Sequence, residues 1–218
     1  MYELYEARNS IYCYEGTDIL KNKLNIQDQE KLYNYERKIV LAKLFILRQK
    51  ENIGNFDIKH FLWIHKFLFD EVYGFAGLLR SENIAKGNFR FAEWQYIEQE
   101  LVKLLDKLKE ENYLKGLSKE EMSKKLAYYM AELNVLHPFR EGNGRTIREF
   151  IREIAVYNGY ELLDCPCEYY LLNLEFTQIE HFSEWLKEFE AGQYPSTSSF
   201  FLHQETIYRL PPKEERHD

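Results

Sequence analysis

The chain has few cysteines and no long apolar stretch among its 218 residues. Cys13, Cys165 and Cys167 do not make up a metal-ligand quartet, and the single residue between the last two is not the usual redox spacing. The first residues, Met1-Tyr2-Glu3-Leu4, do not resemble a signal peptide, and the longest apolar runs are too short for a bilayer. We therefore expect a reduced, cytoplasmic protein with no membrane partner.

Basic residues are outnumbered by acidic ones, and the formal net charge is −7. No basic block is present that could follow a phosphate backbone, so nucleic acid is not expected as a direct partner. Aromatic residues make up 16% of the chain, which favours a folded globule over disorder. At this length a single domain buries about 70% of its unfolded surface.

The most informative stretch is His137-Pro138-Phe139-Arg140-Glu141-Gly142-Asn143-Gly144-Arg145-Thr146-Ile147-Arg148. Pro138 should end a preceding helix, because the residue before a proline is pushed out of the helical region. Gly142 and Gly144 allow positive φ and let main-chain N–H groups approach a ligand. Apolar residues then recur at helical spacing, at Ile147, Phe150, Ile151, Ile154 and Ala155. A helix beginning near Gly144 would point its positive end at this loop, which makes an anion cradle.

The charged residues of this stretch indicate a phosphate site. Arg145 and Arg148 lie three residues apart on one helix face, where two guanidiniums can fork onto phosphate oxygens. Glu141 would be repelled by phosphate unless a divalent cation lay between them, so we expect Mg²⁺ at Glu141. His137 is the group in this stretch that takes up a proton near neutral pH.

These residues resemble the signature of the Fic family, H-P-F-x-[D/E]-G-N-G-R-x-x-R, at every fixed position. Residues 14–17, 75–77 and 128–134 also look like class I Fic toxins, so the resemblance covers about residues 14–190. It implies an all-α Fic fold, a helical bundle with a short β-hairpin flap beside the active site. The implied activity is transfer of AMP from ATP to a Tyr, Ser or Thr hydroxyl of a target protein. His137 would then be the catalytic base, Glu141 the Mg²⁺ ligand, and the phosphate-binding residues Gly142, Asn143, Gly144, Arg145 and Arg148.

The segment from Arg80 to Phe91 breaks the helical rhythm and predicts two extended arms around a turn. From the sequence alone a plain surface hairpin is equally compatible. The resemblance favours a flap that holds a target segment by main-chain pairing at Lys86, Gly87, Asn88 and Phe89.

Helical periodicity predicts the rest of the domain. A first helix should run from Asp28 to before Asn52 with an apolar face of Leu32, Tyr35, Ile39, Ala42 and Ile46. A second should follow the N-cap Asp57, with an apolar face of Phe61, Ile64, Leu68 and Val72. A third should run from Trp94 to about Asn112, with core residues Trp94, Ile97, Leu101, Leu104, Leu105 and Leu108. A fourth should run from a capping box of Ser118 and Glu121 to His137. The signature helix should end at Asn158-Gly159, and another helix is expected over 179–189. We expect one Fic domain over residues 1–195 and a loosely structured tail over 196–218. His60 and His65 should be packed or surface residues rather than metal ligands.

Other functions remain open on the sequence. His137 and Glu141 could be zinc ligands, but no third ligand lies nearby in the sequence. The chain could be a nucleotide-binding module without catalysis, or a Fic transferase of UMP or phosphocholine.

Regulation is indicated by a missing motif. Fic proteins that inhibit themselves carry a helix of pattern [S/T]-x-x-x-E-[G/N], but no Ser or Thr of this chain has Glu four residues later. The nearest match, Ser10 with Glu15-Gly16, is one residue too long. The resemblance therefore implies a small antitoxin that supplies the inhibitory helix in trans. Resemblance to class I toxins also suggests the ATPase subunits of DNA gyrase and topoisomerase IV as targets.

Overall fold

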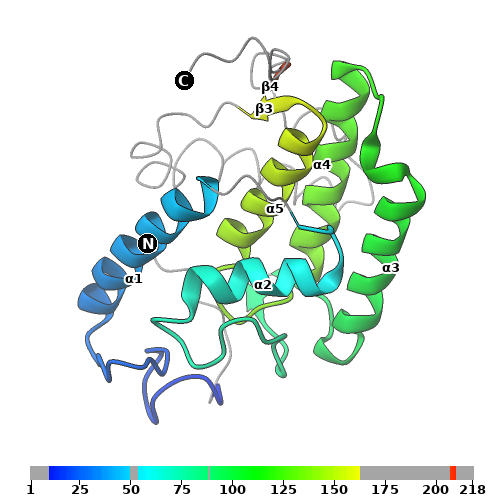
Figure 1. Ribbon diagram of the computed structural model, residues 1–218. Helices are drawn as coiled ribbons and strands as arrows, with labels where there is room; N and C mark the ends of the chain where they lie inside the picture. Colours follow the sequence, from blue (N-terminus) through cyan, green and yellow to red (C-terminus); the bar gives the residue numbers. More distant parts are fainter. Residues whose placement is uncertain (1–9, 50–53, 88, 163–206, 210–218) are drawn as a thin grey trace. The chain divides into compact units, whose positions relative to one another are not determined.

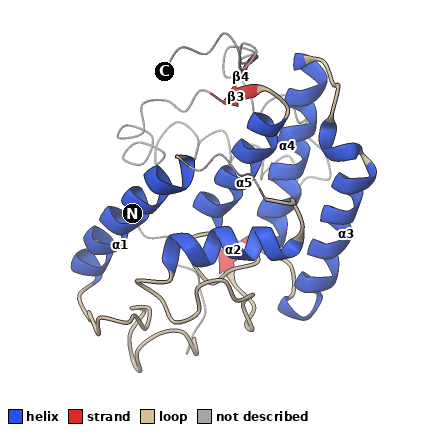
Figure 2. Cartoon of the chain, viewed as in Figure 1, coloured by secondary structure: helices blue, strands red, loops and turns tan. Residues whose placement is uncertain are grey.

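The computed structural model describes residues 10–49, 54–87, 89–162 and 207–209. These residues fall into two compact units, of which one combines 10–110 with 132–150 and the other combines 111–131 with the later residues. In both units the regular structure is mainly helical, and the strands of the described ranges form two short antiparallel pairs (Figures 1 and 2). The predicted all-α class with a short hairpin is confirmed. The single-domain boundary at residue 195 stays a prediction.

The first unit opens with two helices that pack against each other, α1 (Gln29–Arg48) and α2 (Ile58–Phe69) (Figure 1). Each begins after an aspartate N-cap, which was predicted as such at Asp57 and only as the helix start at Asp28. Asp28 accepts a hydrogen bond from the Lys31 N–H, and Asp57 accepts one from the His60 N–H. The predicted apolar face of the second helix is buried, at Phe61, Ile64, Leu68 and the following Val72.

The predicted apolar face of α1 is right at Leu32 and wrong at Ala42 and Ile46. Its buried residues are Leu32, Glu36, Val40 and Leu47, whereas Ala42 and Ile46 are exposed. The buried face of α1 includes the carboxylate of Glu36, because this carboxylate forms an ion pair with the guanidinium of Arg145 in the signature stretch. Apolar periodicity alone therefore selected a neighbouring row of residues.

The predicted hairpin is present as β1 (Ala85–Lys86) and β2 (Phe89–Arg90). Ala85 pairs with Arg90 and Lys86 with Phe89 in antiparallel register, while Asn88 lies outside the described residues. A 3₁₀ turn, η1 (Trp94–Tyr96), leads into α3 (Ile97–Glu110). Of the apolar residues that predicted this helix, Ile97, Leu101, Leu104, Leu105 and Leu108 are buried. Trp94 lies in η1 and is exposed, so its predicted place in the core is wrong.

The second unit begins with the 3₁₀ turn η2 (Asn112–Leu114) and most of α4 (Lys119–Leu136). The capping box is confirmed, since the Ser118 N–H donates to Glu121 Oε2 (3.0 Å) and the Glu121 N–H donates to Ser118 Oγ (3.3 Å). The unit also contains the last turns of α5 (Asn143–Tyr157). This helix ends as predicted, with Gly159 at φ +76° in the C-cap position.

A second antiparallel pair, β3 (Tyr160–Leu162) and β4 (Ile207–Arg209), closes the second unit. No strand was predicted within the tail, because three residues are too few to show an alternating pattern. The expected helix over 179–189 and the pair Cys165 and Cys167 lie outside the described residues. None of the helices in the described ranges is long and apolar enough to cross a membrane.

Candidate active site

The signature stretch forms a buried loop between two helices of the sequence. Helix α4 ends at Leu136, before Pro138, and α5 begins at Asn143, one residue earlier than predicted. The Asn143 side chain braces the loop: its Oδ1 accepts from the Phe139 N–H (2.8 Å) and its Nδ2 donates to the Phe139 carbonyl (2.7 Å). The predicted role of Asn143 in holding phosphate stays a prediction.

Only one of the two glycines carries the predicted positive φ. Gly142 has φ +80°, and a Cβ built there would lie 2.4 Å from the ring of Phe69. Both the conformation and the space therefore require glycine. Gly144 lies inside α5 without positive φ, and the Arg148 guanidinium lies 3.3 Å from the position of its missing Cβ. This contact places Arg148 beside the first turn of α5, close to the predicted cradle.

His137 is held in one tautomer. Its side chain is buried, and Nδ1 lies 3.1 Å from the Asn134 carbonyl oxygen. Because a carbonyl can only accept, Nδ1 carries the proton of the neutral ring and the lone pair is on Nε2. The imidazole also stacks on Phe91, with ring centroids 3.8 Å apart and planes 22° apart. A neutral ring with a fixed acceptor nitrogen has the form that a general base needs.

Arg145 lies between two carboxylates. Its Nη1 is 2.5 Å from Glu36 Oε1, and its Nη2 is 3.3 Å from Glu141 Oε1. Tyr73 donates its hydroxyl proton to the other oxygen of Glu36. Burial disfavours the charged guanidinium, but Glu36 and Glu141 outweigh this effect and raise the pKa of Arg145. The arginine is therefore charged at all working pH values and fixed in place, and α1 is tied to the signature loop.

Glu141 provides the carboxylate of the loop. It is buried, and its Oε1 also accepts from the Gly142 N–H at 2.9 Å. A zinc site at His137 and Glu141 would need further protein ligands. In the described part of the chain, no group of three or more His, Cys, Asp or Glu side chains is arranged to hold a metal ion.

His65 links the loop to the segment that enters the hairpin. Its Nδ1 accepts from the Gly77 N–H (2.8 Å), and its Nε2 donates to the Glu141 carbonyl (2.9 Å). The ring stacks on Phe139 at 3.7 Å with planes 5° apart. Burial lowers the pKa of His65 to about 3, although the hydrogen bond to Glu141 acts in the opposite direction. His65 is a neutral packed residue, as expected from the sequence.

The hairpin shows its predicted residues in different environments. Lys86 is half-buried and Gly87 is exposed, with φ +56°. Phe89 is buried and packs edge-on against Phe91, at 5.0 Å between centroids. Contact with a target at Phe89 would therefore involve its main chain rather than its ring.

Sequence reasoning missed three residues that hold the site: Glu36, Phe69 and Arg80. A signal existed for Glu36, since it lies four residues from both Leu32 and Val40 and places a charge in an apolar row. Phe69 was hidden among the core residues of α2, and no spacing rule connects Arg80 to the signature. Arg80 donates to the His137 carbonyl at 2.8 Å.

Comparison with known proteins identifies the family. Residues 55–155 match the Fic/DOC family. The probable protein adenylyltransferase Fic of Escherichia coli (strain K12) is 36% identical over 151 residues, which cover 69% of this chain and 74% of that protein. The chain belongs to the Fic/DOC family. The predicted Fic relationship is thus confirmed.

Two further Fic proteins are similar over most of the chain. Protein adenylyltransferase VbhT of Bartonella schoenbuchensis is 42% identical over 158 residues, which are 72% of this chain but 33% of VbhT. The chain thus spans about a third of the length of that relative. The crystal structure of BepC from Bartonella tribocorum, a VirB-translocated effector with bound AMPPNP, has a TM-score of 0.77 and 25% identity. The similarity covers 92% of this chain and 97% of that Fic structure.

The contact between Gly142 and Phe69 gives a stability prediction for this Fic domain. Ala at Gly142 must adopt positive φ and also displace the ring, whereas Gly116, with the same φ of +80°, has no atom within 4 Å of its missing Cβ. We expect G142A to lower the free energy of unfolding by about 1–3 kcal/mol more than G116A does. Urea denaturation of both variants measures the difference. Equal losses of unfolding free energy in the two variants would show that the loop accommodates a methyl group at position 142 without cost from Phe69.

The buried neutral His65 gives a pH prediction. Between pH 6.5 and 3 the unfolded chain takes up a proton at His65 that the folded chain does not, so stability should fall as the pH is lowered through this window. The slope attributable to His65 is at most about 1.4 kcal/mol per pH unit. Denaturation at a series of pH values should show a shallower fall for H65Q than for the natural chain. The same slope in both proteins would contradict the assignment.

Proposed function

We propose that this chain is a protein adenylyltransferase that transfers AMP from ATP to a hydroxyl of a target protein. The observation that carries the proposal is the fixed tautomer of His137, which places a lone pair on Nε2 beside a glycine loop and a helix N-terminus. Relatives named protein adenylyltransferase, and the AMPPNP bound to BepC, support the same reaction.

In this reaction His137 Nε2 takes the proton of the target hydroxyl. The hydroxyl oxygen bonds to the α-phosphorus of ATP, the bond from that phosphorus to the oxygen of the β-phosphate breaks, and pyrophosphate leaves. Main-chain N–H groups at Asn143 and Gly144 lie in the first turn of α5, where an anion is stabilised. The Gly142 N–H directly before them donates to Glu141 Oε1. Arg145 and Arg148 hold the departing pyrophosphate.

Magnesium forms part of the proposal through Glu141. Glu36, Glu141 and Arg145 together carry one net negative charge, so this corner of the loop is better suited to receive a cation with the phosphates than to receive phosphate alone. The carboxylate oxygens of Glu141 are donors of the kind that Mg²⁺ prefers. When bound, the ion would offset charge on the phosphates of ATP.

The finer proposal is a toxin that a separate antitoxin controls. It rests on the missing inhibitory motif in this chain and on its likeness to class I Fic toxins. The antitoxin would supply a glutamate that pairs with Arg148. The targets would be the ATPase subunits of DNA gyrase and topoisomerase IV, held by the flap at Lys86, Gly87, Asn88 and Phe89 through main-chain pairing.

The role of His137 is tested by transfer of label. Incubation of the protein with a bacterial lysate, Mg²⁺ and α-labelled ATP should label a protein band, and H137A should lower the rate by ~10²–10⁴-fold. ATP binding measured by calorimetry should be unchanged in H137A, because the histidine acts on the hydroxyl rather than on the nucleotide. Parallel reactions with labelled UTP and CDP-choline distinguish AMP transfer from the other Fic chemistries. Near-normal transfer by H137A would show that His137 is not the base.

Toxicity is tested by expression alone in a bacterial host. The chain should arrest growth, and H137A should relieve the arrest at the same protein level. Activity of the purified chain without any partner is the matching measurement in vitro. An inactive purified chain that becomes active when one of its own glutamates is changed would reveal an internal inhibitor and contradict the antitoxin proposal.

A further inference from the structure

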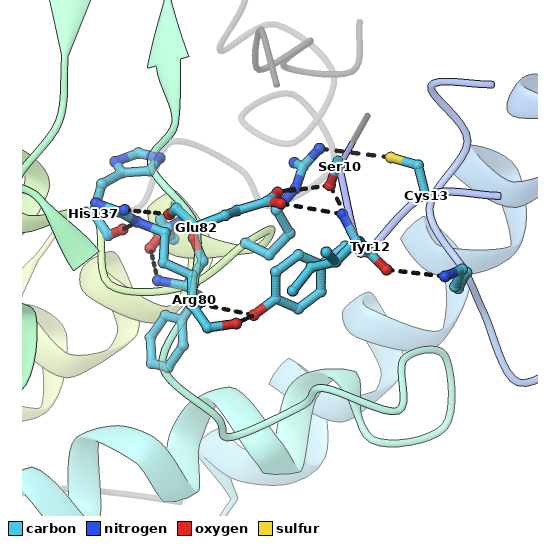
Figure 3. Close-up of polar contacts among 12 residues, drawn as sticks. Ser10, Tyr12, Cys13, Arg80, Glu82 and His137 are labelled. Carbon is cyan, nitrogen blue, oxygen red and sulfur yellow. Dashed lines mark hydrogen bonds and ion pairs between the residues drawn. The ribbon is translucent and has the colours of Figure 1, made fainter. Parts of the chain in front are cut away.

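Arg80 is a buried arginine that binds main-chain carbonyls around the catalytic loop. It is 2% exposed, although arginine is seldom buried. Its Nε donates to the His137 carbonyl (2.8 Å), and its Nη2 donates to the Leu136 carbonyl (3.2 Å) and to the Ala92 carbonyl. Its Nη1 donates to the Glu82 carbonyl at 2.7 Å. Figure 3 shows Arg80 and Glu82 beside His137 with these bonds drawn.

The four carbonyls come from three segments of the first unit. Leu136 and His137 form the end of α4 and the start of the signature loop. Glu82 precedes β1 and Ala92 follows β2, so both arms of the flap reach the same guanidinium. The main chain of Arg80 adds a further bond, from its N–H to the Pro138 carbonyl at 2.9 Å. One side chain therefore joins the base of the flap to the catalytic histidine.

His137 needs such support because its backbone is strained. Its φ is +45°, in the left-handed region that a residue with a Cβ adopts only when its surroundings hold it there. The bond from Arg80 to the His137 carbonyl fixes the peptide that follows the residue. The flap also contacts the His137 side chain directly, because Phe91, which follows β2, stacks on the imidazole ring.

The entering arm of the flap is fixed a second time through Glu82. Its Oε1 accepts from Arg140 Nε (3.0 Å), which belongs to the signature loop, and from Ser10 Oγ (2.6 Å). The Ile11 N–H donates to the other carboxylate oxygen at 3.2 Å. The carbonyl of Glu82 that Arg80 holds is thus part of a segment whose side chain also bonds the signature loop; Figure 3 labels Glu82 between Arg80 and Ser10.

We infer that Arg80 is a positioning residue: its guanidinium holds His137 in its orientation and ties both arms of the flap to it, so that a target hydroxyl presented by the flap meets Nε2. This inference rests on the proposed function. Arginine suits the role because its planar group offers five N–H donors in fixed directions, whereas lysine offers three from a single nitrogen. A lysine at position 80 keeps the charge and loses the fork.

The test compares R80K with R37K, which makes the same change on α1 at an arginine outside this cluster. We expect R80K to lower kcat for target labelling on the order of 10–100-fold, the scale of a misplaced catalytic group. The Kd for ATP should stay at the value of the natural chain, and R37K should change neither quantity. In an H137A background, R80K should add no further loss, because the arginine acts through the histidine. Unchanged kcat in R80K, or a loss in the H137A background as large as in the natural one, would overturn the inference.

A readout without catalysis separates this inference from the proposed function. Nitrogen NMR of histidine-labelled protein, assigned by comparison with H137A, should show His137 protonated on Nδ1 in the natural chain and as a mixture of tautomers in R80K. If the natural chain transfers nothing, the proposed function fails while the tautomer still decides whether Arg80 orients His137. A single Nδ1–H tautomer in R80K would overturn the positioning role.

A second variant covers the case in which R80K does not fold. F91L removes the ring that the flap stacks on the imidazole and leaves Arg80 intact. Coupling between the flap and the base predicts that F91L lowers kcat, leaves the Kd for ATP unchanged and mixes the tautomers. If R80K is unfolded and F91L retains both kcat and the single tautomer, Arg80 is only structural and the inference is wrong.

Discussion

A loop that is buried must have its main-chain polar groups hydrogen-bonded, and this constraint shapes the region around residues 137–142. The stretch from His137 to Gly142 is buried throughout, yet it belongs to neither of the helices that flank it. Side chains therefore supply the hydrogen bonds that a helix or sheet would otherwise make to these main-chain groups. Asn143 bonds both polar groups of Phe139, Arg80 bonds the first carbonyls, and His65 bonds the carbonyl of Glu141.

The same constraint explains why the charges of the site come in groups. A buried guanidinium is costly to desolvate unless carboxylates compensate it, and Arg145 has two of them within ion-pair distance. Glu36 reaches it from α1, which is why a carboxylate occupies the buried face of that helix. The position of α1 within its unit is thus coupled to the electrostatics of the loop through the ion pair of Glu36 with Arg145.

Sequence periodicity predicted the elements well where the burial was apolar. The N-caps Asp28 and Asp57, the capping box at Ser118, the apolar faces of α2 and α3 and the C-cap at Gly159 all follow local rules that act within a few residues. The signature predicted the family because its fixed residues are contiguous. The signature did not reveal that Arg80 and His65 bond the loop. Their partners are main-chain carbonyls far away in the sequence, and every residue type has a carbonyl, so the sequence carries no signal of these bonds. The strand β4 was missed because its pairing partner is also distant.

The bonds of Arg80 to carbonyls have a consequence for how the protein can diversify. Every amino acid carries a carbonyl, so the arginine places no demand on the side chains at Leu136, Glu82 or Ala92. Arg80 therefore sets the geometry at the base of the hairpin through main-chain contacts, whereas the side chains of Glu82 and Phe91 make their own contacts with Arg140 and His137. A change of side chain at Leu136 or Ala92 would leave the bonds of Arg80 in place, so the sequence can vary at these positions without loss of the link between the hairpin and the signature loop.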